Sequence, residues 1–100
     1  MTSNEFEKYC KERVAQWHNT MLVGIIPGLG EIKSSNVFMT WFSKVADKKK
    51  GLFGVDIVGD NHYYEFTEIS DTEIVMDVYD QIAKETWNPH LPSVGTVLVK

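Results

Sequence analysis

Apolar and polar residues alternate over much of the stretch Leu52–Ile69. Two runs rich in β-branched and aromatic residues flank Asp60-Asn61, a pair that tolerates left-handed backbone conformations. A two-residue loop there would set Val55 opposite Phe66, so that both strands would keep their apolar residues on one face. The pattern therefore predicts a β-hairpin over 52–69 with Asp60-Asn61 as its turn.

Three other stretches repeat their apolar residues with helical spacing. The first extends from Ser3 to about Met21 and has Thr2 or Ser3 as its cap. The second starts near Ser35 or Asn36, covers 36–48, and is followed by lysines and the stop glycine of 48–51. The third starts at the capping signal of 70–73 and ends before Asn88-Pro89. The sequence therefore predicts three helices.

The last stretch, Val94–Val99, is apolar on both sides, which is typical of an interior strand. No repeat, linker or low-complexity tract divides the chain, so 1–100 is expected to form a single domain. We expect an α+β two-layer sandwich, in which three helices pack on a small, mainly antiparallel sheet built around the 52–69 hairpin. The last strand would join this sheet beside the first hairpin strand.

Composition limits the classes of protein to consider. Hydrophobic residues make up 43% and charged residues 24% of the chain, as in ordinary globular domains. Cys10 is the only cysteine, so no internal disulfide can form, and the longest apolar run, Met21–Ile26, is too short to cross a membrane. These features favour a cytoplasmic protein without a membrane segment.

The net charge of −4 hides a strong asymmetry along the sequence. Residues 1–50 hold eight Lys or Arg against five Asp or Glu, whereas residues 51–90 hold nine Asp or Glu against one Lys. The acidic half would attract cationic partners and repel nucleic acid. A solvated surface that only keeps the protein soluble is the alternative interpretation.

No set of reactive residues points to catalysis. Asp60 and His62 could form an acid/base pair, but turn residues are exposed and would titrate near their reference values. Cys10 lies in the apolar stripe of the first predicted helix, and His18 is expected at its polar border. The histidines lack metal-ligand spacing, and Gly28-Leu29-Gly30 lacks the residues of a phosphate loop. We therefore expect that the protein is not an enzyme and that it binds neither a cofactor nor a metal ion.

Partner binding is better supported. The predicted hairpin register sets Asp56 across from Glu65 and Val58 across from Tyr63 on the outer face, where carboxylates beside an aromatic anchor suit Arg or Lys side chains. The turn residues extend this patch, and the acidic face of the third predicted helix could add to it. The predicted partner-binding residues are Asp56, Val58, Asp60, Asn61, Tyr63, Glu65, Asp77 and Asp80.

In size and charge the chain is similar to the small inhibitor and immunity proteins that block basic enzymes. This similarity implies an acidic protein-binding module that neutralises a basic partner, such as a nuclease toxin or a defence enzyme, by occluding its active site. One alternative is a small-molecule-binding domain or enzyme with an aromatic pocket between the predicted helix 36–48 and the sheet. Another is a subunit of a larger assembly.

Overall fold

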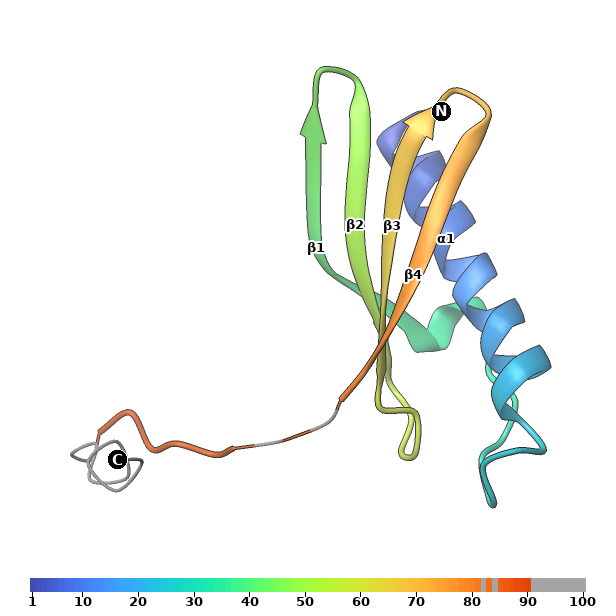
Figure 1. Cartoon of the computed structure of the whole chain (residues 1–100), viewed down its shortest axis with the longest axis vertical. Helices are drawn as coiled ribbons and strands as arrows, with labels where there is room; N and C mark the ends of the chain where they lie inside the picture. The colour runs from blue at the N-terminus through green and yellow to red at the C-terminus, as the bar shows by residue number, and fades with distance from the viewer. Residues whose placement is uncertain (82, 84, 91–100) are drawn as a thin grey trace.

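The computed structural model describes residues 1–81, 83 and 85–90. In this part of the chain one α-helix and two short helical turns precede four strands (Figure 1). The elements are α1 (Ser3–Trp17), the π-helical turn η1 (His18–Leu22), the 3-10 turn η2 (Ser34–Asn36), β1 (Val37–Val45), β2 (Lys48–Val55), β3 (His62–Ser70) and β4 (Glu73–Asp80). The protein is α+β, but the predicted arrangement of three helices on a small sheet is wrong.

The helix α1 begins with a capping box. The Thr2 hydroxyl accepts a hydrogen bond from the Glu5 backbone N–H at 3.1 Å, and the Glu5 carboxylate accepts one from the Thr2 N–H at 2.6 Å. The first predicted helix is therefore confirmed, although its regular part ends at Trp17 and a π-helical turn continues to Leu22. Among the described residues, no helix combines the length and the apolar character needed to cross a membrane.

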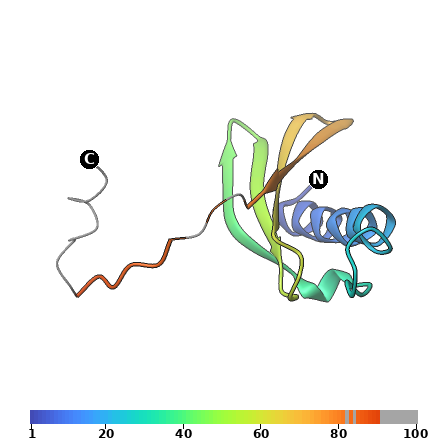
Figure 2. The ribbon, with the colours of Figure 1, turned by 60° about the horizontal axis from the view of Figure 1, so that its bottom comes forward.

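The four strands lie in chain order, β1-β2-β3-β4, and every neighbouring pair is antiparallel. Short turns join β1 to β2 and β3 to β4, whereas residues 56–61 join β2 to β3. The helix α1 lies along one side of this sheet (Figure 2). The described chain therefore has two layers, a helix and a sheet, and the second face of the sheet has no helix on it.

The core lies between α1 and the sheet. Phe6, Cys10 and Val14 are fully buried on the helix, and Phe53 and Phe66 meet them from β2 and β3 with their rings edge to face at 5.5 Å. Burial raises the pKa of the Cys10 thiol to about 12. Cys10 is therefore a small core residue and not a nucleophile.

The second predicted helix, 36–48, is wrong, because this stretch forms β1 and a tight turn. Ala46 and Asp47 have φ of 49° and 66°, the left-handed pair that a two-residue hairpin turn requires. The apolar residues that suggested a helix recur every four positions, and an even spacing also keeps residues on one face of a strand. A bulge between Met39 and Trp41 then shifts the alternation of side chains by one residue, so the residues after it point to the opposite faces of the sheet from those that an unbroken strand would give. The triple lysine begins β2 instead of ending a helix.

The third predicted helix, after the signal at 70–73, is also wrong. Asp71 and Thr72 form the turn between β3 and β4, and the Ser70 hydroxyl accepts a hydrogen bond from the Thr72 N–H. The same polar residues that cap helices also stabilise turns, so the signal was ambiguous. Residues 85–90 contain neither a helix nor a strand. The predicted strand Val94–Val99 lies outside the described residues.

The central hairpin exists, but its turn and register differ from the prediction. β2 and β3 pair antiparallel with Phe53 opposite Tyr64 and Leu52 opposite Glu65, and the loop between them spans 56–61. The predicted two-residue turn at Asp60-Asn61 is wrong. Asp60 is buried and makes hydrogen bonds inside the protein, so it does not lie at the exposed tip of a turn. Consequently Asp56 does not lie across from Glu65.

Candidate functional site

The face of the sheet that points away from α1 carries large aromatic side chains. Side chains alternate along each strand, so the register places Phe38 and Trp41 of β1 on the same surface as Tyr63 of β3 and Tyr79 of β4. Each of the four is between 43% and 50% exposed. We call this surface the open face, because no helix of the described chain lies on it (Figure 2). Exposed aromatic surfaces of this kind mark interaction sites.

Cross-strand pairs arrange the open face in rows that run perpendicular to the strands. The pairs Trp41–Leu52, Leu52–Glu65 and Glu65–Asp77 define one row, and Tyr63–Tyr79 lies in the row beside it. A third row, on the other side of the first, consists of Ser43, Lys50, Thr67 and Val75. Aromatic, acidic and basic groups therefore occupy neighbouring rows of a regular surface.

Gly54 makes room for the Phe38 ring on this face. A Cβ at Gly54 would lie 2.6 Å from Cζ of Phe38, closer than real contacts allow. The ring therefore lies directly over the β2 backbone, where a side chain would displace it. This contact fixes the position of Phe38 although the ring is half exposed.

Two carboxylates occupy the centre of the open face. Glu65 and Asp77 are a cross-strand pair, and Glu65 accepts a hydrogen bond from the Tyr79 hydroxyl at 3.1 Å. This hydrogen bond and the negative charge of Glu65 raise the pKa of Tyr79. The Lys50 ammonium lies 3.7 Å from Glu65, and both side chains are partly exposed. A salt bridge of this kind contributes little to stability, and Lys50 can offset at most one of the two negative charges.

The two halves of the sheet carry opposite charge. Residues 37–55, which include β1 and β2, contain four Lys and one Asp. Residues 62–80, which include β3 and β4, contain six Asp or Glu and neither Lys nor Arg. The acidic asymmetry seen in the sequence is therefore concentrated in one hairpin of the fold.

The structure divides the predicted partner-binding residues into three groups. It brings Tyr63, Glu65 and Asp77 together on the open face, although Asp77 comes from a strand and not from a helix. It places Asp56, Val58 and Asn61 in the 56–61 loop, where Val58 is 97% exposed. The last two, Asp60 and Asp80, both contact His62.

Asp60 is the centre of a buried hydrogen-bond network. Its carboxylate contacts Nδ1 of His18 at 2.6 Å and Nδ1 of His62 at 2.9 Å, and it accepts a hydrogen bond from the Tyr64 hydroxyl at 3.0 Å. The His62 backbone N–H donates to the same carboxylate at 3.0 Å. Nε2 of His18 lies 2.9 Å from the Gly30 carbonyl oxygen. The network connects the segment after α1, the 56–61 loop and β3.

Burial and hydrogen bonding act in opposite directions on Asp60. Burial alone would raise its pKa, but hydrogen bonds from His18, His62 and Tyr64 outweigh that effect and hold the pKa of Asp60 below its ordinary value. Burial and the adjacent Asp60 charge raise the pKa of Tyr64. Asp60 is therefore an ionised, internal carboxylate, and the prediction that it lies exposed at a turn is wrong.

The predicted position of His18, at the polar border of the first helix, is wrong. Its side chain is fully buried. The signal was present, because Phe6, Cys10, Val14 and His18 recur at intervals of four. Extending the apolar stripe by one step would have predicted a buried histidine, which requires polar partners inside the protein.

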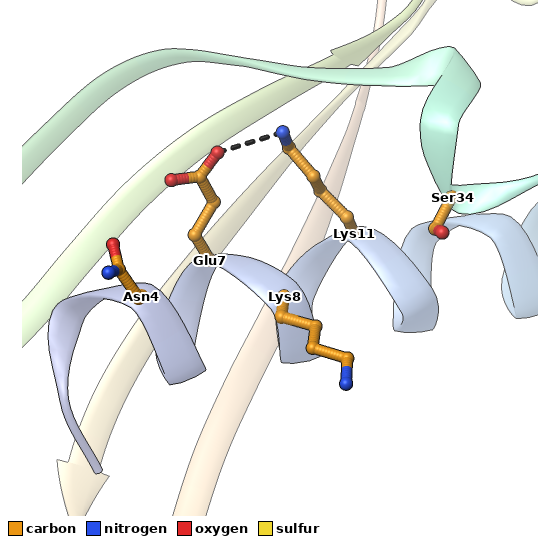
Figure 3. Close-up of a pocket in the computed structure, with 5 residues that line it drawn as sticks. All are labelled: Asn4, Glu7, Lys8, Lys11 and Ser34. Atoms are coloured by element: carbon orange, nitrogen blue, oxygen red, sulfur yellow. Dashed lines mark ion pairs between the residues drawn. The ribbon is translucent and has the colours of Figure 1, made fainter.

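Small cavities lie beside α1 and at one end of the open face. One of about 290 Å³ lies beside α1, where Glu7 and Lys11 point toward the neighbouring strand and form an ion pair at 2.8 Å, while Lys8 points away (Figure 3). Another, of about 190 Å³, lies at the end of the open face between Phe38 and Tyr63. Ligand pockets usually enclose about 300–1,000 Å³. The aromatic pocket predicted beside helix 36–48 loses its premise, because that helix does not exist.

Among the described residues, no three His, Cys, Asp or Glu side chains gather in a way that could hold a metal ion.

The basic residues on α1 are partly engaged within the protein. Lys11 pairs with Glu7, and Arg13 donates a hydrogen bond to Gln16. The open face is therefore the feature of the described structure with the clearest capacity to bind a macromolecule.

Residues 7–88 match the model of a family of unknown function, DUF6275. The match covers most of the chain and includes α1 from Glu7 onward, all four strands and the Asp60 network. Comparison with curated proteins gives no match, and comparison with solved structures gives none either. Nothing in these comparisons indicates catalysis.

Proposed function

We propose that this chain, which belongs to the DUF6275 family, is a protein-binding module that docks onto a basic partner through its open face. The observation that carries the proposal is the exposure of Phe38, Trp41, Tyr63 and Tyr79 on one face of a regular four-stranded sheet. Tyr, Trp and Phe are enriched in the centres of protein interfaces, because they bury large areas at small conformational cost. The regular sheet beneath them would keep the surface preorganised.

Charge supports a basic partner. Glu65 and Asp77 lie between the aromatic side chains, and the β3–β4 hairpin that carries them has no positive side chain other than histidine. Such a surface raises the association rate of a cationic protein and is screened by salt. Arginine side chains of the partner could contact carboxylates and aromatic rings at the same time.

The finer proposal is inhibition by occlusion. If the partner is a nuclease toxin or a defence enzyme, the carboxylates of the open face would take positions that substrate phosphates otherwise occupy. We place this action in the cytoplasm. Support for that compartment comes from Cys10, the single cysteine, which is a buried free thiol.

The experiment combines capture with surface mapping. The tagged protein is incubated at low salt with a lysate of its native host, eluted with a salt gradient, and the released basic protein is identified by mass spectrometry. The purified partner is then titrated into isotope-labelled protein. We expect amide resonances of the open-face strands to shift. Shifts confined to the exposed side of α1 would contradict the proposed surface.

A further inference from the structure

Two imidazole rings, those of His18 and His62, have an oxygen atom against each of their nitrogens. His18 contacts the Asp60 carboxylate with Nδ1 and the Gly30 carbonyl with Nε2. His62 contacts Asp60 with Nδ1 at 2.9 Å and Asp80 with Nε2 at 2.7 Å. The two rings thus make four short contacts, and each requires a hydrogen between nitrogen and oxygen.

Neutral rings cannot supply four hydrogens, because a neutral imidazole carries one N–H. The Gly30 carbonyl can only accept, so a single proton on Nε2 of His18 would leave the Nδ1 lone pair 2.6 Å from Asp60. Asp60 cannot easily provide the missing hydrogen, because it already accepts from the Tyr64 hydroxyl and the His62 backbone N–H. The doubly protonated form of both rings satisfies every contact.

We propose that His18, Asp60 and His62 form a proton-dependent latch that ties the 56–61 loop to the segment after α1. In the closed latch both imidazoles carry two protons. When the pH rises, a ring releases one proton to solvent, a nitrogen lone pair then faces a carboxylate or carbonyl oxygen, and the contact is lost.

Charges within the closed latch balance. Two imidazolium rings stand against two carboxylates, Asp60 from the loop and Asp80 from β4. Tyr64 of β3 is the other titratable group in contact with this set, and it donates to Asp60. From α1, the Trp17 ring packs against the His62 ring in a T-shaped pair with centroids 6.1 Å apart, and it adds no charge. Removing one proton would leave one imidazolium against the two carboxylates, and the buried Asp60 would lose one of its two cationic neighbours, which weakens the closed latch.

Opening is expected to stay local. Asn19 holds Ile32 with two hydrogen bonds, at 2.8 and 2.9 Å, and neither depends on a histidine proton. The segment after α1 therefore keeps its place when the latch opens, and the loop moves. That loop carries Asp56, Val58 and Asn61, so its position controls an exposed end of the molecule. The latch does not depend on the proposed partner, and its test needs only the free protein.

The experiment follows the imidazole nitrogens of the intact protein by nuclear magnetic resonance from about pH 5 to pH 8. His90 is exposed and provides an internal control. We expect both nitrogens of His18 and both of His62 to carry protons at slightly acidic pH, because each nitrogen faces an oxygen atom. Amide resonances of 56–61 should shift as these two rings titrate, while those of the turn at 46–47 should not.

A conservative variant separates the latch from a merely structural role. Asp80 has a side chain that is 74% exposed, so Asp80→Asn should fold normally. It should make His62 lose its second proton at lower pH and leave His18 unchanged. The proposal is overturned if either ring has a single protonated nitrogen at slightly acidic pH, or if the loop amides do not respond when the rings lose these protons.

Discussion

Glu65 and Asp77 face each other across β3 and β4, as a pair of like charges on the side of the sheet that α1 leaves uncovered. Like charges in a cross-strand pair destabilise a sheet, so this arrangement costs the free protein stability. If a cationic partner binds here, its positive charge removes the repulsion between the two carboxylates. We therefore expect the pair to lower the stability of the free protein and to favour binding of the partner.

The first prediction concerns this conflict. Asp77→Asn removes one of the two charges and keeps the side-chain size, so it should raise the free energy of unfolding by about 0.2–1 kcal/mol. The same substitution at Asp71, an exposed turn residue without a charged residue across from it, should have a smaller effect. Urea denaturation of both variants provides the measurement. A loss of stability in Asp77→Asn would show that the pair is not repulsive.

The second prediction tests the packing of the core at Gly51. A Cβ at this position would lie 2.9 Å from Cε1 of Phe53, which is fully buried and cannot move away. We therefore expect Gly51→Ala to lower the free energy of unfolding by about 1–3 kcal/mol. Gly30 has no atom within 4 Å of the corresponding position, and Gly30→Ala should change stability by less than about 0.5 kcal/mol. Equal effects of the two substitutions, measured by thermal unfolding, would refute this packing.

The third prediction concerns Asp60 and acid. Because the pKa of Asp60 in the folded protein lies below its ordinary value of 3.8, its contribution to stability is present above that value and is lost as the pH falls through the folded-state pKa. Asp60→Asn leaves buried His18 without its counter-ion and should cost about 3–5 kcal/mol near neutral pH. The difference between the native protein and the variant should shrink at strongly acidic pH.

Denaturation of both proteins across the acid range measures this difference directly. The buried pair of Glu68 and Lys49 does not disturb the comparison. Burial raises the pKa of Glu68, but the Lys49 N–H and ammonium lower it by more, so the pKa lies below its ordinary value. The protein therefore also loses the contribution of this pair to stability in acid. Both proteins retain this pair, so its contribution cancels. A difference that grows as the pH falls would contradict the assigned role of Asp60.

Local sequence signals predicted α1 correctly and β1 and β4 wrongly, and the reason is physical. The capping box at Thr2 and Glu5 acts within one turn, so the sequence contains everything needed to predict it. In contrast, Ile74 and Val78 lie four residues apart, which suits one face of a helix and also one face of a strand. Pairing with β3 decides between these structures, and that pairing depends on the rest of the chain.

The candidate site shows the same division. The sequence predicted that Tyr63, Glu65 and Asp77 share one surface, and all three lie on the open face, while their role in binding stays a prediction. It could not identify the role of Asp60, because the buried partner His18 lies 42 residues earlier in the chain. A pair so distant in sequence is set by the packing of the loop against the segment after α1.

The measurement that tests the central claim most directly is binding of the basic partner to a charge-reversed open face. Glu65→Lys combined with Asp77→Lys should abolish capture, because it places two positive charges where the partner is expected to dock. The matched control, Glu12→Lys combined with Glu31→Lys, changes the net charge equally at exposed positions away from the open face. We predict that the control retains the partner with only a modest loss. Equal retention by both variants, or equal loss, would contradict a specific acidic and aromatic binding surface.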